Sequence, residues 1–208
     1  MRQVICLSGI LLLLSCGGQS QEKKADRPVG GRCEGCEVTL TGMPATVEWK
    51  GRIASPDEPG EPLVMEGVIY KKDGKTPAEG IIMYLYHTNN KGVYAPAPGQ
   101  TGMVARHGKL RGWVKTGKDG RYQFTTIRPA TYPNTTFAAH IHPMIKEPGL
   151  QAYYIDEYIF ADDPYVHADY DKKQEQRGGS GVVKLQKDAS GTWRGKRDII
   201  LGLNVPGY

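Results

Sequence analysis

The sequence predicts an all-β fold, an antiparallel β-sandwich with long loops. From residue 47 onward, short apolar or alternating runs are separated by glycine, proline, asparagine and aspartate, which is typical of strands joined by turns. Helical periodicity is almost absent over the same stretch. Asp-Gly pairs, which favour tight hairpin turns, border several of the runs. We therefore expect one sandwich domain over residues 33–208, a length that supports a single hydrophobic core.

The first residues are typical of an export signal. Arg2 supplies a positive charge, and the apolar run that follows is too short to span a bilayer. The run ends in Leu-Leu-Ser-Cys at residues 13–16, which resembles the bacterial lipobox, in which the cysteine receives the lipid. We expect residues 1–15 to be a lipoprotein signal peptide and Cys16 to be lipidated. The alternative is an ordinary secretory signal cleaved near Ser20.

Residues 16–32 are expected to form a flexible tether. They are polar and glycine-bearing, so they bury too little apolar surface to offset the entropy of ordering. The domain would then be exported and lipid-anchored to the bacterial cell envelope, with a membrane as one partner. The sequence leaves open which membrane carries the anchor, and whether the domain faces the periplasm or the cell surface.

Charge and cysteine content limit the other partners. The formal net charge is +5, and Lys and Arg are scattered rather than gathered in one stripe, which argues against nucleic acid as a partner. With Cys6 removed in the signal peptide and Cys16 lipidated, Cys33 and Cys36 remain as a pair in an oxidising compartment, where a local disulfide is expected. A zinc site would need a second pair, and a thioredoxin-like role would need a βαβ context.

The strands are expected in an order set by turns at Asp73-Gly74, 89–92 and Asp119-Gly120. In the run that begins at residue 122, the two aromatic side chains Tyr122 and Phe124 should point one way and Gln123 the other. Residues 95–109 hold repeated proline and glycine and should form a long loop over one end of the sandwich. The best helical candidate covers residues 165–176. The expected strands are 63–70, 81–87, 110–115, 122–127, 138–145, 155–160, 181–186 and 192–203.

The segment His140-Ile141-His142 carries the first chemical signal. In a strand, residues i and i+2 face the same side, so two imidazoles can converge on one metal. The apolar neighbours indicate a partly buried strand, where imidazoles without partners would be costly. The alternative is a pair of polar residues on a solvated face.

A family resemblance surrounds this pair. Residues 120–129 read Gly-Arg-Tyr-x-Phe-x-Thr-Ile-x-Pro, and they are followed by Tyr132-Pro133 and by Ala-His-Ile-His at 139–142. This order resembles the signature of the intradiol ring-cleavage dioxygenases, the catechol and protocatechuate 3,4-dioxygenase group. The resemblance extends over roughly residues 65–164, because a strand, an Asp-Gly turn, a strand and Gly-x-Tyr at 92–94 follow in the family's order.

The resemblance implies a transthyretin-like sandwich with a non-haem iron(III) site. The family's four protein ligands fall on Tyr94, Tyr132, His140 and His142, and the catalytic residues are Tyr94 and Tyr132, with Tyr132 at the position of the displaceable axial tyrosinate. It also implies a catechol-type substrate and O2, with ring opening between the two hydroxylated carbons to a muconate-type diacid. Two tyrosinates and a hydroxide would balance the charge of Fe(3+).

One position departs from the family. An arginine that stabilises negative charge on the reacting ring would stand three residues before His140, where this chain has Phe137. Loss of a positioned cation costs several kcal/mol of transition-state stabilisation. Arg106 or Arg111 could compensate. We expect Phe137 and Tyr86 to line the substrate pocket, and Tyr84 to lie beside it.

Other readings stay open at this point. His87, His107 and His167 are most simply surface histidines, and tyrosine is a good strand former, so Tyr94 could serve packing alone. The main alternative is a non-catalytic envelope binding module on a transthyretin-like or carboxypeptidase-regulatory-like sandwich. A cupin-type site that uses Glu147 lacks the second half of its motif. The particular catechol and the oligomeric state are not predicted.

Overall fold

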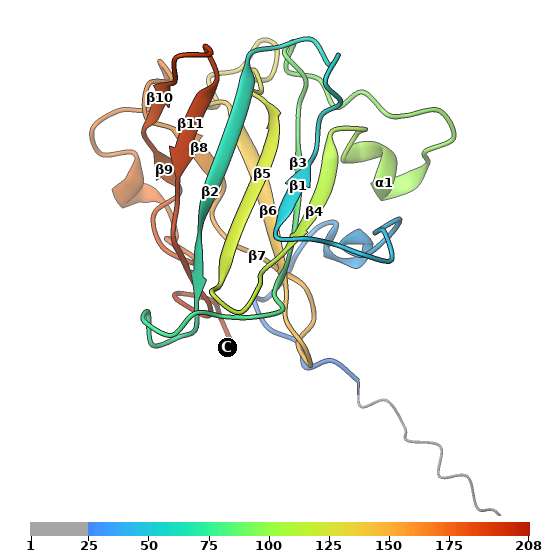
Figure 1. Ribbon diagram of the computed structural model, residues 1–208, viewed down its shortest axis with the longest axis vertical. Coiled ribbons are helices and arrows are strands. Elements are labelled where there is room, and N and C mark those ends of the chain that lie inside the picture. The colour runs from blue at the N-terminus through green and yellow to red at the C-terminus, as the bar shows by residue number, and fades with distance from the viewer. Residues whose placement is uncertain (1–24) are drawn as a thin grey trace, which may run out of the picture.

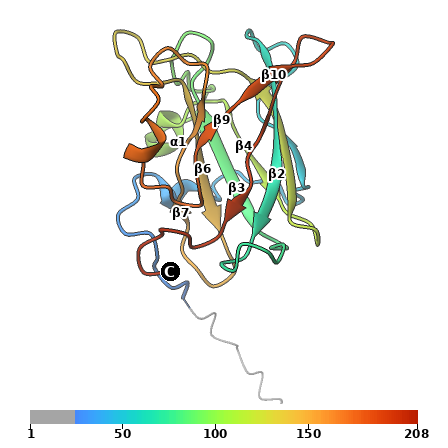
Figure 2. The same ribbon diagram turned by 90° about the vertical axis from the view of Figure 1, so that its left-hand side faces the viewer.

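The computed structural model describes residues 25–208, which fold into two six-stranded β-sheets packed face to face (Figure 1). The predicted signal peptide and Cys16 lie outside the described residues. Viewed at right angles, β2 of the first sheet and β3 and β6 of the second lie in separate layers (Figure 2). The predicted all-β sandwich is therefore confirmed.

The first sheet has the strand order β1-β5-β2-β11-β10, and β12 also pairs with β2. Its central pair is antiparallel, with Met65 opposite Phe124. The strands of this sheet are β1 (Lys50–Arg52), β2 (Pro62–Tyr70), β5 (Arg121–Ile127), β10 (Leu185–Lys187), β11 (Trp193–Lys196) and β12 (Ile199–Ile200).

The second sheet has the order β4-β3-β6-β8-β9, and β7 also pairs with β6. The antiparallel pairing of β3 with β6 sets Tyr86 opposite His142, which places the histidine motif beside the tyrosine-bearing strand. The strands of this sheet are β3 (Ile82–His87), β4 (Arg111–Lys115), β6 (His140–Lys146), β7 (Tyr153–Tyr154), β8 (Tyr158–Phe160) and β9 (Val182–Val183).

The prediction of an antiparallel sandwich holds for most strand pairs, including β2 with β5 and β3 with β6, but four pairs are parallel. These are β1 with β5, β2 with β11, β2 with β12, and β8 with β9. The paired strands in each case are joined by long connections instead of tight hairpins, and a long connection is what parallel pairing requires. The local sequence pattern does not indicate beside which strand a long connection places the next strand.

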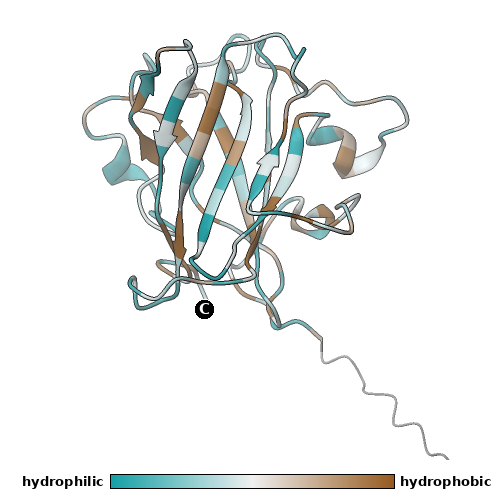
Figure 3. Ribbon diagram, viewed as in Figure 1, coloured by the Kyte–Doolittle hydropathy of each residue, from teal (hydrophilic) through white to brown (hydrophobic). Residues whose placement is uncertain are grey.

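Alternation along the strands separates the core from the outer faces. In β5, Tyr122 and Phe124 are buried in the core while Gln123 is half-buried, as predicted. Figure 3 shows the corresponding change between hydrophobic and hydrophilic colour along the front strands. In the second sheet, Leu85 and Ile141 belong to the core. Because successive side chains point to opposite faces, their neighbours Tyr84, Tyr86, His140 and His142 lie on the outer face of that sheet.

Residues 95–109 do not form the featureless loop that we predicted. They contain the short helix α1 (Gly102–Arg106), and they cover the outer face of the second sheet instead of one end of the sandwich. The reason is that His107, directly after α1, is buried against the tyrosines of β3. Figure 1 shows α1 beside the N-terminal segment on this side of the domain.

Other expected elements are shorter than predicted. The helix predicted at 165–176 is reduced to a 3-10 turn, Asp171–Lys173, within the charged loop. The strand predicted at 192–203 is interrupted between β11 and β12, where the Asp198 carboxylate replaces a backbone acceptor for Val68 N–H at 3.0 Å. The strands β1 and β7, of three and two residues, were not predicted.

The tether predicted at residues 16–32 extends too far toward the C-terminus. Arg27 pairs with Leu150, and Val29 is buried in the core, so residues 25–32 belong to the folded domain. The N-terminal segment then continues through Cys33 and Cys36, which form a disulfide, and the 3-10 turn Cys36–Val38. Over residues 25–208, no helix combines the length and the apolar character needed to cross a bilayer.

Candidate metal centre

Strand β6 presents the two predicted histidine ligands side by side. Ile141 between them is fully buried in the core, so His140 and His142 both point to the outer face. Their Nε2 atoms lie 3.1 Å apart. The local period of the strand is therefore enough to bring the two imidazoles together.

The two tyrosines arrive from loops on either side of this strand. Tyr94 follows β3 and Tyr132 precedes β6, and their hydroxyl oxygens lie 2.8 Å apart. The loops are held against each other at Gly92, which has φ +76°, and a Cβ at this position would overlap the backbone carbonyl of Thr131. Glycine permits both the positive φ and the close approach. The spacing of the tyrosines thus depends on a contact between two loops.

The four predicted ligand side chains converge on one point. Tyr132 Oη lies 2.9 Å from His140 Nε2 and 3.5 Å from His142 Nε2, and His142 Nε2 lies 2.9 Å from Tyr94 Oη. Nitrogen and oxygen donors about 2.0–2.2 Å from a shared metal ion lie roughly 3 Å from one another. The observed separations therefore match those of ligands around a single ion.

The second nitrogen of each imidazole has its own partner. His140 Nδ1 lies 2.7 Å from the backbone oxygen of Ala138, and His142 Nδ1 lies 3.5 Å from Glu157 Oε1. Both partners are acceptors, so each Nδ1 carries the proton and each Nε2 directs a lone pair into the centre. Two lone pairs facing each other at 3.1 Å need a cation or a proton between them. This arrangement is what histidine ligands of a metal show.

Glu157 is a functional residue that we did not predict from the sequence. Burial alone would raise its pKa, but the hydrogen bond and charge of His142, together with His140, outweigh burial and lower its pKa to about 2. Glu157 is thus a carboxylate throughout the physiological range, next to a metal-ligand candidate. No motif marks it, because it contacts His142 through the pairing of β6 with the β8 region.

The electrostatic environment favours neutral side chains when no cation is present. Burial raises the pKa of Tyr94, and the neighbouring Tyr132 raises it further; burial also raises the pKa of Tyr132. Burial, followed by the charge of His142, lowers the pKa of His140 and keeps its imidazole neutral, as a metal ligand must be. A bound cation would reverse the effect on the phenols by stabilising their anions.

Ferric iron fits this donor set. Two phenolic oxygens are hard ligands that provide two negative charges to a trivalent ion, and imidazole nitrogen is a common iron ligand. The imidazole lone pairs are already aimed at the centre by Ala138 and Glu157. The four side chains can therefore hold an iron ion without a change of tautomer.

A cavity of about 190 Å³ opens beside the centre. Tyr86 lines it, as predicted, whereas the expected pocket residue Phe137 does not. The Phe137 ring is 65% exposed and meets the Tyr132 ring edge-on, with the centroids 6.3 Å apart. The cavity is lined by Glu34, Tyr86, Tyr94, Met103, Arg106, His107, Tyr132 and His142.

Two of the three remaining histidines are not at the surface. His107 and His87 are both buried, which corrects the prediction, while His167 is exposed as expected. His87 Nε2 lies 2.6 Å from Thr126 Oγ1, so a core hydrogen bond satisfies it. His107 instead lines the cavity. Sequence reasoning missed both because burial of a loop or strand-end histidine depends on the chain packed above it.

The two candidate cations differ in their placement. Arg106 lines the cavity and forms an exposed ion pair with Glu34 at 3.2 Å. Arg111 donates to the Thr41 backbone oxygen, and its guanidinium lies over the Trp113 ring, so its charge is engaged away from the cavity. Arg106 is therefore the better placed replacement for the cation that Phe137 does not provide.

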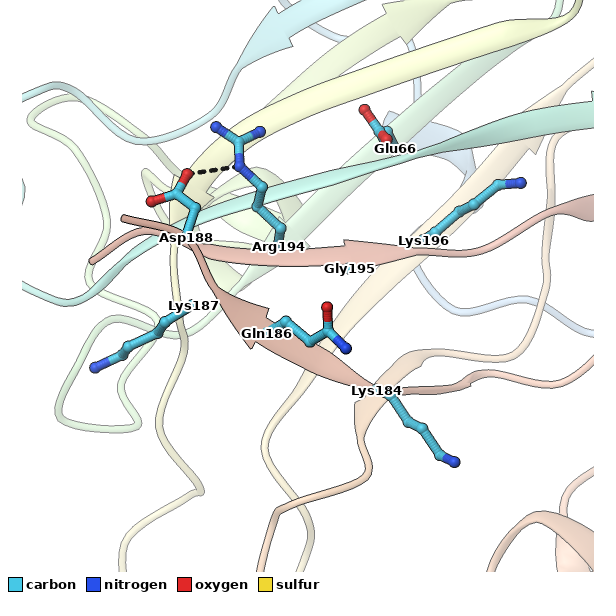
Figure 4. A pocket seen from close by; sticks show the side chains of 8 residues that line it. All are labelled: Glu66, Lys184, Gln186, Lys187, Asp188, Arg194, Gly195 and Lys196. Carbon is cyan, nitrogen blue, oxygen red and sulfur yellow. Dashed lines mark hydrogen bonds and ion pairs between the residues drawn. The ribbon is translucent and has the colours of Figure 1, made fainter. Parts of the chain in front are cut away.

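Neither Glu147 nor the groove on the first sheet forms a competing metal site. The Glu147 carboxylate accepts the hydroxyls of Tyr153 and Tyr208 at 2.6 and 3.0 Å, which argues against the cupin alternative. The groove in Figure 4 lies on the first sheet, away from the histidines, and its Arg194 is paired with Asp188 at 2.6 Å. We find no convergence of metal-ligand side chains among the residues drawn there.

Comparisons with known proteins agree with this geometry. A protein family described as Dioxygenase matches residues 45–194. Catechol 1,2-dioxygenase 1 of Acinetobacter lwoffii is 41% identical over 81 residues, which cover 38% of this chain and 24% of that protein. Chlorocatechol 1,2-dioxygenase of Rhodococcus opacus is 30% identical over 151 residues, which cover 62% of this chain and 53% of that protein. The chain thus spans about half or less of the length of these relatives.

Solved structures share the fold. The dioxygenase domain of a dioxygenase and carbohydrate-binding fusion protein from Streptomyces sp. SirexAA-E superimposes with a TM-score of 0.56 at 22% identity, covering 76% of this chain and 91% of that one. Catechol 1,2-dioxygenase from Acinetobacter sp. ADP1, inhibited by bound mercury, gives a TM-score of 0.56 at 22% identity, covering 76% and 59%. At these identities the likeness concerns the fold.

Proposed function

Because the chain belongs to the intradiol ring-cleavage dioxygenase family, we propose that it uses iron(III) and O2 to open a catechol-type ring. The bond that breaks joins the two hydroxylated carbons, both oxygen atoms of O2 enter the product, and the product is a muconate-type diacid. The observation that supports this proposal most directly is the convergence of Tyr94, Tyr132, His140 and His142.

The geometry and the family resemblance together support the ligand roles. His140 and His142 offer neutral nitrogens, and Tyr94 and Tyr132 offer oxygens that become anionic beside the ion. A bound ferric ion would supply the Lewis-acid and charge-transfer chemistry that makes the ring of a catechol-type substrate reactive toward O2. The family resemblance assigns to Tyr132, which lines the cavity, the phenol that would leave the ion when substrate binds, and its oxygen would then accept a proton from a substrate hydroxyl.

The walls of the cavity hold the substrate ring. Tyr86 presents an aromatic surface, and its stacking on His142, with centroids 4.6 Å apart, keeps that surface next to the ligand. Arg106 provides positive charge at the mouth of the cavity. Its ion pair with Glu34 is exposed, and because exposed ion pairs are weak, the guanidinium is available to a bound substrate. We propose that Arg106 takes over part of the role of the family's arginine.

The test is turnover by iron-loaded protein. Residues 25–208 are loaded with ferric iron, and O2 uptake is measured with catechol, protocatechuate and hydroxyquinol while ultraviolet absorbance reports the diacid. Equal consumption of O2 and substrate is expected with at least one of them. If a broad catechol panel gives neither O2 uptake nor diacid, the protein is instead a binding module on the same sandwich.

We also propose that the protein is exported and anchored by lipid at Cys16. The N-terminal motif supports this, and the disulfide between Cys33 and Cys36 suits an oxidising compartment. Cells that express the full chain are fed a labelled fatty acid. Label should enter the wild type and be absent from Cys16→Ala, and equal labelling of both would contradict the proposal.

A further inference from the structure

The disulfide loop, residues 33–36, packs directly on the buried imidazole of His107. Gly35 has φ +83°, and a Cβ built on it would lie 2.7 Å from His107 Cε1 and closer still to Nε2. There is no space for a side chain between the loop and the ring. The loop therefore blocks the Nε2–Cε1 edge of the His107 ring.

His107 begins a column of stacked rings that ends at a candidate metal ligand. Its imidazole lies face to face with Tyr86, with centroids 3.8 Å apart and planes 7° apart. Tyr86 in turn stacks on His142, with centroids 4.6 Å apart and planes 16° apart. Tyr84 Oη is hydrogen-bonded to His107 Nδ1 at 2.9 Å, which fixes the rotation of the first ring.

The column defines the tilt of the His142 ring. Glu157 lies at the His142 Nδ1 edge, whereas Tyr86 covers the face of the ring. A ring that could swing away from Tyr86 would move Nε2 relative to the other three donor atoms, which now lie 2.9–3.5 Å from it. Ligand geometry therefore depends on residues that do not touch the ion.

We propose that His107 is a positioning residue for the metal centre, clamped by the disulfide loop so that it holds Tyr86 against His142. The proposal rests on the proposed ferric site. It gives the predicted disulfide a structural role, because the loop blocks one edge of the first ring in the column. It also explains why a histidine is buried directly after α1.

The first experiment compares two glycines of the same segment. Gly31 has φ +71° with no atom within 4 Å of a built Cβ, so Gly31→Ala carries similar backbone strain without the contact that Gly35→Ala makes. Ferric protein is mixed with excess chelator, and the visible iron-tyrosinate absorbance is followed. Gly35→Ala should shift the band and lose iron about tenfold faster than wild type, as changes behind metal ligands do, while Gly31→Ala behaves as wild type.

A second pair of variants separates stacking from hydrogen bonding. His107→Phe combined with Tyr84→Phe keeps a ring on Tyr86 and leaves no hydroxyl without a partner, so the band position and the iron-release rate should stay near wild type. His107→Gln keeps an acceptor but removes the ring, so it should lose iron about tenfold faster. Thermal unfolding of each iron-free variant shows whether the fold itself has been lost.

The outcomes distinguish this proposal from the proposed function. A wild type that binds no ferric iron overturns both. A wild type that binds iron and turns over a catechol, while Gly35→Ala and His107→Gln release iron at the wild-type rate with an unshifted band, overturns the positioning role alone. Equal losses in Gly31→Ala and Gly35→Ala would also overturn it, because backbone strain would then be the cause.

Discussion

Replacement of Glu157 by glutamine tests whether the carboxylate behind His142 belongs to the metal centre. Glu157→Gln keeps the size and an acceptor oxygen but removes the negative charge that faces Nδ1 at 3.5 Å. The loss of such a partner lowers metal affinity by about 10–100-fold. This contact is longer than a good hydrogen bond and the Glu157 side chain is 37% exposed, so we expect the lower end, about tenfold.

The assay is competition for ferric iron against a chelator at equilibrium, read from the visible absorbance of the protein. Glu66→Gln is the matched control, because it makes the same charge change at an exposed position on the first sheet. Wild type and Glu66→Gln should agree within twofold. If Glu157→Gln also agrees with them, the negative charge of the carboxylate does not support His142 as a ligand.

Further predictions concern the ligands, the cavity cation and acid stability. Tyr132→Phe and His142→Ala should each abolish the visible iron-tyrosinate band; a wild-type band in both would refute the ligand assignment. Arg106→Gln should lower kcat/KM for catechol about tenfold with the melting temperature unchanged, since loss of a positioned charge costs transition-state stabilisation. Glu34→Gln should not lower kcat/KM. Equal effects of the two variants would show that Arg106 acts only as a surface ion pair. Burial lowers the pKa of His87 to about 4 from an ordinary 6.5, so the unfolded chain binds the proton more readily than the folded chain. The contribution of neutral His87 to folding stability is therefore complete above pH 6.5 and is lost as the pH falls toward 4. The expected loss in the free energy of unfolding between pH 7 and 5 is about 2 kcal/mol. Denaturant unfolding of iron-free wild type and His87→Gln measures this loss, which should be smaller in the variant.

The contrast between β6 and α1 shows what limits prediction from this sequence. The facing of His140 and His142 follows from the period of a strand, and that period operates over three consecutive residues. The burial of His107 follows from the disulfide loop at one edge of its ring and Tyr86 against its face, which are more than 70 and 20 residues away in the chain, respectively. A local pattern cannot report such contacts, so His107 was expected at the surface.

The sequence by itself determined the all-β class, most of the long strands and the family, because alternation, turn residues and motif order are local properties of the chain. It also named the four side chains that meet at the candidate centre. The tertiary structure alone decided the four parallel strand pairs, the positions of Glu157 and His107, and the position of Arg106 rather than Arg111 at the cavity. The physical reason is that these depend on where long connections return to the sheets, which is fixed by packing of the whole domain.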